Sequence, residues 1–570
     1  MAEEVWMLQT KKADFKQIGA RFRIDPVTAR IIRNRGIEGE AAIDRYLNGT
    51  LDDLYDPMLL KDMEHAVSIL CEAVDTGKKI RIVGDYDIDG VCSTYILLQA
   101  FERLGSDVDF EIPDRIKDGY GINESIIEQA HADGVEVILT CDNGISAFHQ
   151  VELAKKYGMT VVITDHHEVP LDGEKEKIPP ADAVIDPKQA DCPYPFPEIC
   201  GAVVAYKLVQ VLYARRGVPQ MEWLDLLEFA AIATVGDVMK LQDENRILVK
   251  YGLKKMAQTK NIGLRRLAEK NNLDLGAITA YHIGFVIGPC LNAGGRLKTA
   301  KEALALLRAQ SEEEAERLAE ELKELNDTRK DMTEQGTEAA KLQVESWYQK
   351  DKVLVVFLPE CHESLAGIIA GRLREYYQKP AIVLTRGEEA VKGSGRSIDE
   401  YHMFKKLTEV SDLLLKFGGH PLAAGLSLEE KNIDEFRRRL NENAGLTEED
   451  FKAKVWIDVP MPVGYVTERL VRELSCLEPF GQGNEKPLFA EKSLRIRASR
   501  VLGRNRNVVK MTLEETDGHA IEALYFGDGT AFEEERAGRR EIDVVYYPDI
   551  NEYNGRKTLQ AVIRRYKFRG

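Results

Sequence analysis

The sequence predicts an α/β protein with a parallel sheet in its first half, a second α/β domain, and a small β-barrel at the end. Three apolar, β-branched runs indicate the buried strands of the first sheet: 80-IRIV-83, 135-VEVILT-140 and 159-MTVVIT-164. Stretches with helical periodicity separate these runs, which is typical of a parallel sheet with crossover helices. At 570 residues, the chain is long enough for three or four domains with sizeable cores.

The regions before and after this sheet follow in chain order. Residues 1–60 are predicted to form a short helical lead-in, because 25-DPVTARIIRNRG-36 offers an aspartate cap followed by proline in the first turn. The sheet-bearing domain is predicted to span residues 61–295. Residues 296–350 contain a charged, proline-free run with apolar residues at helical spacing. Such a run alone also suits a coiled-coil dimerisation segment, but between two α/β regions it favours a long connecting helix.

Residues 351–450 are expected to form the second α/β domain. The predicted order is strand, helix and strand, over 352-KVLVVFL-358, 362-HESLAGIIAGRLREYY-377 and 380-PAIVLTR-386. The glycine runs 393-GSGRS-397 and 418-GGH-420 would let backbone amides approach an anion closely. Arg396 could add a bidentate grip on a phosphate.

Residues 451–570 are predicted to form an OB-type β-barrel that binds nucleic acid. The stretches 492–510 and 555–570 carry seven and six basic residues, respectively, and no acidic residue. Strand-like alternation and turn signals indicate the barrel. Tyrosines available to stack on bases are Tyr546, Tyr547 and Tyr553. The alternative is that the basic strands only balance a chain of net charge −17, a value that by itself argues against a nucleic-acid partner.

Acidic and histidine side chains follow the ends of the predicted strands. The motifs are 84-GDYDIDG-90, 141-CDNG-144 and 164-TDHHE-168. Residues just past the carboxyl ends of neighbouring parallel strands converge on one crevice. We therefore expect one small volume to hold Asp85, Asp87, Asp89, Asp142, Asp165, His166 and His167. Asp237, which ends an apolar, helix-like run, is a further candidate.

Several carboxylates in one small volume require a cation. Two unit charges about 4 Å apart interact with about 4 kcal/mol at an effective dielectric near 20, and here the interaction is repulsive. Oxygen ligands with a neutral imidazole suit Mn²⁺ or Mg²⁺, whereas zinc more often recruits thiolates or more histidines. A single aspartate after a strand is more often a helix cap or a turn residue. Four such segments in order, one of them with adjacent histidines, favour a metal-dependent phosphoester site.

The DxDG, DNG, DHH and GD motifs, in this order, resemble those of the DHH phosphoesterase superfamily. Further motifs narrow the resemblance to the RecJ-type single-stranded-DNA-specific exonucleases: 112-IPDRIKDGYG-121, 288-GPCLNAGGRL-297, 325-LNDTRK-330, 393-GSGRS-397, 417-FGGHPLAAG-425, 479-PFGQGNEKP-487 and 552-EYNGRKTLQ-560. The resemblance covers nearly the whole chain. It implies a DHH catalytic domain, a DHHA1 domain that closes over the metal site and binds substrate, and an OB-type domain.

The resemblance also implies a ligand set for two metal ions. The ligands would be Asp85, Asp87, Asp89, Asp142, His166 and Asp237. Asp87 would hold one ion, Asp89 the other, and Asp142 would bridge both. His166 and Asp237 would complete the second site.

Other residues of the matching motifs would act on the substrate. His167 would contact the scissile phosphate, and Asp165 would orient His166. Catalysis is therefore expected to depend on His167, Asp165 and Asp142. The implied substrate-binding residues are Arg115, Arg296, Ser394, Arg396 and His420. Some of these arginines would anchor a 5′-terminal phosphate.

The activity implied by the resemblance is hydrolysis of phosphodiester bonds in single-stranded DNA, from 5′ to 3′, in DNA repair and recombination. Two Mn²⁺ or Mg²⁺ ions would lower the pKa of a bridging water, so no nucleophilic side chain is required. The implied partners are single-stranded DNA and, by family analogy, a single-strand-binding protein and a RecQ-type helicase. We expect a monomer that is not attached to a membrane.

The sequence departs from the family pattern in places. Cys290 and Gly294 stand where family members often carry arginine and alanine. Cys361 precedes His362 in place of a typical tryptophan, and Gly395 stands where alanine is usual. These changes affect predicted substrate contacts and not metal ligands. We expect them to alter rate, polarity or end preference rather than to abolish activity.

The composition fits a cytoplasmic enzyme. The eight cysteines form no CxxC pair and no zinc spacing, so we interpret them as reduced thiols. The first twelve residues carry charges where a signal peptide needs an apolar core. No apolar run approaches the roughly 18 residues that a membrane-spanning helix needs.

Three other functions fit parts of the sequence. A DHH enzyme for cyclic dinucleotides, oligoribonucleotides or pyrophosphate would share the acidic motifs, but the basic C-terminal region argues against it. A non-catalytic single-strand-binding scaffold would be expected to have lost some metal ligands, and all are present here. The third alternative is a protein that forms oligomers through the charged helix. A sedimentation measurement of its oligomeric state would test this alternative.

Overall fold

The computed structural model describes residues 4–115, 118–553 and 555–569. The chain divides into two compact units. One unit contains Leu54–Met239 and Ile247–Ala453, and the other contains Glu4–Asp53, Lys240–Arg246 and Lys454–Gly570. In the described ranges, none of the helices combines the length and the apolar character needed to cross a membrane.

The first α/β domain is built on five parallel strands in the order β3-β2-β4-β5-β8. Their bounds are Ile80–Val83 (β2), Val108–Glu111 (β3), Val137–Cys141 (β4), Thr160–Thr164 (β5) and Ala183–Ile185 (β8). The three predicted strands are confirmed. Because β2 pairs with both β3 and β4, the strand order reverses beside β2, and such a reversal opens a ligand crevice at the carboxyl ends of the strands.

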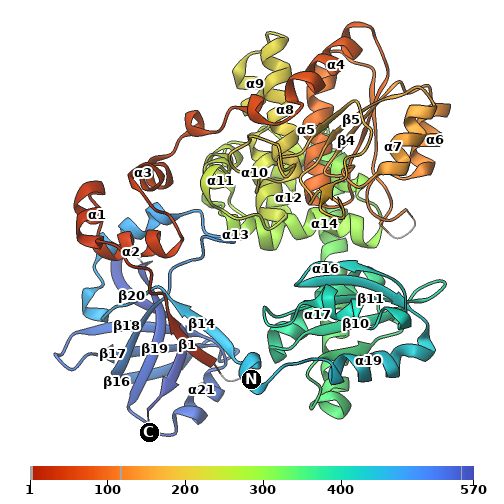
Figure 1. Ribbon diagram of the computed structural model, residues 1–570. Helices are drawn as coiled ribbons and strands as arrows, with labels where there is room; N and C mark the ends of the chain where they lie inside the picture. Colours follow the sequence, from red (N-terminus) through yellow and green to blue (C-terminus); the bar gives the residue numbers. More distant parts are fainter. Residues whose placement is uncertain (1–3, 116–117, 554, 570) are drawn as a thin grey trace. The chain divides into compact units, whose positions relative to one another are not determined.

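Helices cover both faces of this sheet (Figure 1). One face carries α4 (Met63–Asp75), α5 (Ile88–Arg103) and α8 (Gly201–Arg215), and the other carries α6 (Glu124–Ala132) and α7 (Phe148–Lys156). Further helices follow: α9 (Gln220–Leu224), α10 (Leu227–Gly236), α11 (Asp243–Met256), α12 (Ile262–Lys270), α13 (Ala280–His282) and α14 (Gly288–Leu297). The predicted parallel α/β architecture is therefore confirmed.

A long helix, α16 (Glu312–Gln343), leads to the second α/β domain (Figure 1). The predicted connecting helix is interrupted, because α15 (Lys301–Arg308) ends before α16 begins. Ser311 starts the new helix by accepting a hydrogen bond from the Glu314 backbone N–H at 3.2 Å. Three glutamates in the first turn also suit the positive end of a helix. The sequence therefore contained this start signal.

The second α/β domain has a sheet in the order β12-β13-β11-β10-β9, in which only β9 and β10 are parallel. The elements are β9 (Leu354–Phe357), α17 (Glu363–Tyr377), β10 (Ala381–Arg386), β11 (Val391–Arg396), α18 (Met403–Thr408), β12 (Leu414–Gly419), β13 (Ala423–Leu428) and α19 (Ile433–Glu442). The predicted strand, helix and strand are confirmed. The glycine runs, however, lie in β11 and β12 and not in anion-binding turns. Position 393 requires glycine for packing, because a Cβ there would come within 2.6 Å of the Leu384 side chain.

The second unit begins with residues that the sequence suggested were only a helical lead-in. β1 (Glu4–Leu8) pairs with β14 (Ala453–Ile457), and α1 (Phe15–Phe22), α2 (Pro26–Asn34) and α3 (Glu40–Asn48) follow. Asp25 caps α2 as predicted, at 2.8 Å from the Val27 nitrogen. Arg35 and Asp458, 423 residues apart, share hydrogen bonds of 2.7 and 3.3 Å. Pairing over such a separation leaves no local signal in the sequence.

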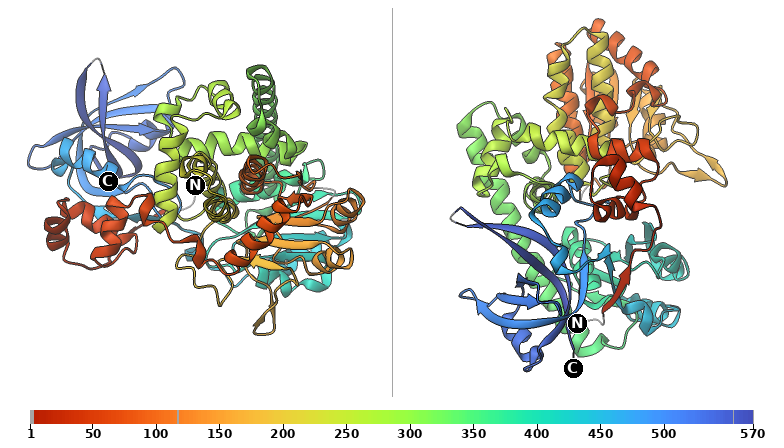
Figure 2. Two further views of the ribbon diagram at one scale, coloured as in Figure 1. Left: turned by 90° about the horizontal axis from the view of Figure 1, so that it is seen from above. Right: turned by 90° about the vertical axis from the view of Figure 1, so that its left-hand side faces the viewer.

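The C-terminal strands pair in the order β16-β17-β18-β20-β19, and β19 also pairs with β16. Figure 2 shows these strands, drawn in blue, gathered in one β-domain. Their bounds are Phe489–Leu502 (β16), Val508–Glu514 (β17), Ala520–Phe526 (β18), Glu541–Tyr553 (β19) and Arg556–Phe568 (β20). The predicted OB-type arrangement is confirmed. The stacking role of Tyr546 is wrong, because the residue is fully buried and its hydroxyl donates to the Met461 carbonyl at 2.9 Å. The side chain of Tyr553 lies outside the described residues.

Candidate active site

The DxDG motif forms a tight turn between β2 and α5. Asp87 caps α5 by accepting hydrogen bonds from the backbone N–H groups of Asp89 at 2.9 Å and Gly90 at 3.1 Å. A Cβ at position 90 would come within 2.5 Å of the Asp85 backbone nitrogen, so only glycine permits this turn. As a result, carboxylate oxygens of Asp85, Asp87 and Asp142 all lie within 4.8 Å of one another.

Asp142 reaches the same crevice from the end of β4. Its φ of 61° lies in the left-handed region, which costs a residue other than glycine roughly 1–2 kcal/mol. Gly201 leaves room for it, since a Cβ there would come within 2.7 Å of the Asp142 Cβ. Asp142 Oδ1 is buried and accepts no hydrogen bond from the described residues, although His166 Nε2 lies 3.1 Å from it. A strained carboxylate with an unsatisfied oxygen is typical of a ligand position.

The N-terminus of α8 fixes Asp89. The backbone N–H groups of Gly201 and Ala202 donate to its two carboxylate oxygens at 2.7 and 2.8 Å. The partial positive charge at the start of a helix stabilises such a carboxylate. The sequence does not reveal this support, because only the fold brings position 201 next to position 89.

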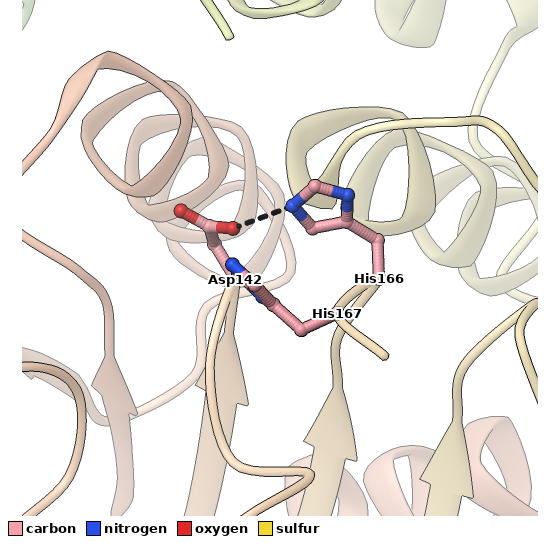
Figure 3. Close-up of side chains that lie close together, drawn as sticks. All are labelled: Asp142, His166 and His167. Carbon is pink, nitrogen blue, oxygen red and sulfur yellow. Dashed lines mark ion pairs between the residues drawn. The ribbon is translucent and has the colours of Figure 1, made fainter. Parts of the chain in front are cut away.

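His166 extends from the end of β5 toward three carboxylates. Its Nε2 lies 3.1 Å from Asp142 Oδ1, 3.4 Å from Asp89 Oδ2 and 3.8 Å from Asp237 Oδ2. Figure 3 shows the His166 ring facing Asp142, with His167 beside them. Burial lowers the pKa of His166 and thereby favours the neutral imidazole, which is the form that binds metal ions.

Asp165 supports the ring of His167 and not the ring of His166, which differs from the prediction. Its Oδ1 lies 2.8 Å from His167 Nδ1 and accepts the backbone N–H of His166 at 2.7 Å. The turn after β5 thus places the carboxylate beneath the second histidine. Burial disfavours the charged form of His167, but the hydrogen bond to Asp165 and the charges of nearby aspartates together outweigh burial and raise the His167 pKa to about 9.

Tyr120 is a site residue whose role the sequence did not reveal, although it lies in one of the quoted motifs. Its hydroxyl donates to the Asp142 carbonyl at 2.8 Å and lies 3.0 Å from His167 Nδ1. The residue is 50% exposed, so a bound ligand could reach it. The Tyr120 hydroxyl therefore links Asp142, in the loop after β4, to the side chain of His167.

The carboxylate cluster, defined as Asp85, Asp87, Asp89, Asp142 and Asp237, lacks sufficient positive charge. Burial, and next the charge of Asp87, raise the pKa of Asp85 to about 8. Burial and neighbouring aspartates also raise the pKa values of Asp87, Asp142 and Asp237. Desolvation and like charge both disfavour ionised carboxylates, and a bound cation would reverse both effects.

The residues present fit two hard cations. One set of donor atoms within 4.8 Å comes from Asp89, His166 and Asp237, and a second comes from Asp85, Asp87 and Asp142. A third set, from Asp142, His166 and His167, overlaps both. Carboxylate oxygens with a single imidazole suit Mn²⁺ or Mg²⁺. The structure thus brings together all six residues predicted as metal ligands.

The arginine cluster, defined as Arg115, Arg296 and Arg396, involves α14 and the second α/β domain. Arg296 donates to the Ser364 carbonyl, near the start of α17, at 3.0 Å. Arg396 lies 3.2 Å from Ser394 Oγ, and the Arg115 guanidinium lies 4.8 Å from the centroid of the Tyr86 ring. Burial, and then the charge of Arg115, lower the pKa values of both Arg296, to about 10, and Arg396. The cluster therefore favours an anionic ligand.

The second α/β domain presents its predicted residues to the same region. Gly367 in α17 packs against Arg396, whose Nη2 would lie 2.9 Å from a Cβ at that position. His420 is exposed at the end of β12. The hydrogen bond from Lys188 is the main reason that the pKa of Glu168 is lowered, and His420 contributes to the same shift. His420 is therefore close to the loop that carries the two histidines.

Three family models match successive parts of the chain: the DHH family, N-terminal domain over residues 79–234, the DHHA1 domain over 350–445 and the RecJ OB domain over 457–565. The single-stranded-DNA-specific exonuclease RecJ of Bacillus subtilis is 36% identical over 564 residues, which cover 98% of this chain and 70% of that protein. RecJ of Escherichia coli is 34% identical, with 95% of each chain covered. The chain belongs to the RecJ family. The crystal structure of Thermus thermophilus RecJ with Mn²⁺ matches with a TM-score of 0.84 at 28% identity, covering 99% of this chain and 80% of that one.

The departures from the RecJ pattern lie around the arginine cluster. Cys290 is buried in α14, and its Sγ accepts a hydrogen bond from Asn326 Nδ2 at 3.3 Å. His362 precedes α17 with its Nδ1 2.8 Å from Ser364 Oγ, and a Cβ at Gly395 would meet the Met403 side chain at 3.1 Å. None of these residues belongs to the donor sets described above. The departures thus leave the six residues predicted as metal ligands unchanged.

Proposed function

We propose that this protein is a metal-dependent exonuclease that hydrolyses single-stranded DNA from the 5′ end toward the 3′ end in DNA repair and recombination. The observation that carries the proposal is the presence, in one unit, of two sets of metal donors and a separate cluster of arginines. The first suits cations and the second suits a phosphate. The substrate class is supported by the relatives, which are named single-stranded-DNA-specific exonucleases.

The metal ligands divide between two Mn²⁺ or Mg²⁺ ions. We assign Asp85 and Asp87 to one ion, and Asp89, His166 and Asp237 to the other. Asp142 is assigned to both, because its donor atom belongs to a set with the first pair and lies 3.1 Å from His166 Nε2. When bound, such ions lower the pKa of a coordinated water and stabilise charge on phosphoryl oxygens.

The side chains around these ligands orient the scissile phosphate. Asp165 holds the His167 ring through Nδ1, and the Tyr120 hydroxyl lies 3.0 Å from Nδ1 and 3.2 Å from Nε2 of the same ring. The remaining ring N–H of His167 would donate a hydrogen bond to a non-bridging phosphate oxygen. A donor fixed in advance stabilises the charge that develops there without further reorganisation.

The arginine cluster sets the direction of degradation in this proposal. A terminal phosphate carries more negative charge than a phosphodiester within the strand. Arg115, Arg296 and Arg396, with the hydroxyl of Ser394, would therefore prefer a 5′-phosphate end. Anchoring that end would place the first phosphodiester bond at the metal ligands, so that single nucleotides leave from the 5′ side.

The C-terminal domain would hold the rest of the single strand. Several basic residues of its first long strand and following turn are exposed: Lys492, Arg495, Arg500, Arg504 and Arg506. Others neutralise acidic neighbours, as in the pairs Arg497–Glu514 and Arg569–Asp543. Tyr547 is partly exposed beside Lys486, whose Nζ lies 3.6 Å from the ring centroid. An aromatic ring with adjacent cations is typical of a single-strand track.

The partners are inferred from the family, and the compartment from the cysteines. Family analogy favours a single-strand-binding protein and a RecQ-type helicase as suppliers of the substrate, and we keep the monomer as a proposal. All eight cysteines are free. Free thiols are typical of a reducing compartment such as the cytoplasm.

End-labelled oligonucleotides test the proposed function. We expect a 5′-labelled single strand to release labelled mononucleotide first and a 3′-labelled strand to give a descending ladder, both with Mn²⁺ or Mg²⁺. A chelator should abolish both, and a blunt duplex should resist. Cleavage in chelator, equal cleavage of the duplex, or early release of the 3′ label would each contradict the corresponding part of the proposal.

A further inference from the structure

Two aromatic rings are stacked on each other at the surface of the segment that precedes α14. Tyr281 belongs to α13, and Phe285 belongs to a π-helix, η4 (Ile283–Ile287). The ring centroids lie 4.7 Å apart, with an angle of 27° between the ring planes. Tyr281 is 63% exposed and Phe285 is 67% exposed. Side chains that remain mostly in water contribute little to the core, and π-helical turns are frequent at functional sites.

This π-helix packs against the last turn of α10. Gly284 lies immediately before Phe285 in the sequence, and a Cβ at Gly284 would lie 3.6 Å from Val235 Cγ1. Val235 stands two residues before the metal ligand Asp237. The backbone that carries the two rings therefore contacts the helix turn that presents this ligand.

The start of α14 and the end of α10 both pack against Ile88. A Cβ at Gly288 would lie 3.3 Å from Ile88 Cδ1, and a Cβ at Gly236 would lie 2.6 Å from Ile88 Cγ2. Ile88 stands between Asp87 and Asp89, which belong to the two sets of metal donors. The segment of the two rings is thus packed against the residues that lie between the metal ligands.

The residue after Asp237 is held in a strained conformation. The Met239 N–H donates to the Thr234 carbonyl at 3.0 Å, and α10 thereby ends in a Schellman motif. The left-handed position of this motif is usually glycine, but here it is Val238, with a φ of 57°. A β-branched side chain is crowded in that conformation. Val238 is also 66% exposed, so burial does not offset the strain, and strain of this kind is found at functional sites.

We propose that Val238, Tyr281 and Phe285 form an apolar platform on which the bases of the single strand stack as the strand reaches the metal ligands. The inference rests on the proposed nuclease function and adds a contact for the bases to the contacts that the arginine cluster makes with phosphate. Every base has a π-face, so the platform accepts any sequence. In a duplex the base faces are covered by neighbouring base pairs. The platform therefore favours single strands.

The test measures single-turnover cleavage of a 5′-phosphorylated single strand with Mn²⁺ over a range of concentrations of the full-length protein. We expect Phe285→Ala to raise the half-saturating concentration by about fivefold to a hundredfold, the value of one base stacked on an aromatic ring. The maximal rate should change much less. The slope of log affinity against log salt should stay the same, because stacking releases no counterions.

Strands with a single abasic residue, placed at one position after another from the 5′ end, identify the base that stacks. Wild-type protein should bind most weakly when that base is missing. Phe285→Ala should be indifferent to the abasic residue at the same position. An equally large loss for Phe285→Ala on the strand that lacks this base would overturn the inference, because the ring would then act without a base.

Trp347→Ala is the matched control, because Trp347 is 70% exposed and lies on another π-helix, η5 (Val344–Tyr348). It should leave the half-saturating concentration unchanged. Val238→Gly should raise the melting temperature, since glycine adopts the left-handed conformation without strain, and should weaken binding by about twofold to tenfold. Val238→Gly that binds as tightly as wild type would exclude this residue from the platform.

The remaining outcomes separate the platform from the proposed function. If Phe285→Ala fails to fold, Tyr281→Ala is measured in the same way, with the same expected loss of affinity. Normal cleavage by wild type, with no loss of affinity in Phe285→Ala, would refute the platform alone. A wild type that does not cleave single strands with either ion would refute the nuclease function itself.

Discussion

The carboxylate cluster and the arginine cluster are opposite in charge but alike in how they are built. In each, burial and like-charged neighbours shift the pKa values toward the neutral form: upward for Asp85 and Asp142, downward for Arg296 and Arg396. The carboxylates can discharge by taking up protons, whereas arginine stays protonated at any ordinary pH. Each cluster therefore favours a ligand of opposite charge: a cation at the carboxylates and an anion at the arginines.

Removing the shared metal ligand should have the largest effect. Asp142→Asn keeps the shape of the side chain but removes the charge that both ions use. We expect cleavage to fall by about a thousandfold or more, because metal ions contribute several kcal/mol to stabilising the reacting phosphate. Without metal the variant should melt at or above the wild-type temperature, since it relieves repulsion. Activity above about a percent of wild type with either ion would show that Asp142 is not shared.

The arginine cluster should affect end preference and not metal binding. Arg396→Ala should reduce the preference for a 5′-phosphate over a 5′-hydroxyl by about tenfold to a hundredfold, the value of one charge-assisted hydrogen bond. Mn²⁺ affinity, followed by calorimetry, should not change. Arg386→Ala, an exposed arginine of the same domain, is the control. An unchanged preference for the 5′-phosphate would mean that the arginine cluster does not bind the 5′ end.

Removing the hydroxyl of Tyr120, which contacts both the loop after β4 and His167, should have a smaller effect on cleavage. Tyr120→Phe removes the hydroxyl that contacts the Asp142 carbonyl and His167. We expect kcat to fall about twofold to tenfold, the value of a neutral hydrogen bond, with Mn²⁺ affinity unchanged. Adding His167→Ala to the Tyr120→Phe variant should then lower kcat by a smaller factor than His167→Ala lowers kcat in the wild type. Independent, additive losses would argue that Tyr120 does not act through His167.

The smallest effect is expected in the C-terminal domain, where many cations already have acidic partners. Arg500→Ala with Arg504→Ala removes two exposed cations. Each lost phosphate contact lowers the slope of log affinity against log salt by about 0.7 on a single strand, so the pair should lower it by about 1.4. Arg497→Ala, whose partner is Glu514, should change the slope less. If the three arginines behave alike, exposure does not decide which of them binds DNA.

The sequence predicted much of the carboxylate cluster and less of its surroundings. Parallel strands bring their ends together, so the motifs alone could place Asp85, Asp142 and His166 on one crevice. The support of Asp89 by the α8 amides and the contact of Tyr120 with His167 depend on loops that meet across the fold. Such contacts join residues distant in sequence, and no local pattern encodes them. Tyr546 differs, because it alternates with the buried residues Ile542 and Val544, so the strand pattern itself places it in the core.

The most direct test of the central claim is the number of Mn²⁺ ions bound per chain, measured together with cleavage in the same preparations. Electron paramagnetic resonance counts free and bound Mn²⁺ in the wild type and in Asp142→Asn. The account predicts two ions in the wild type, fewer in the variant, and cleavage of single-stranded DNA only when both ions are bound. Wild-type protein that binds no Mn²⁺, or that degrades single strands equally well in chelator, would contradict it.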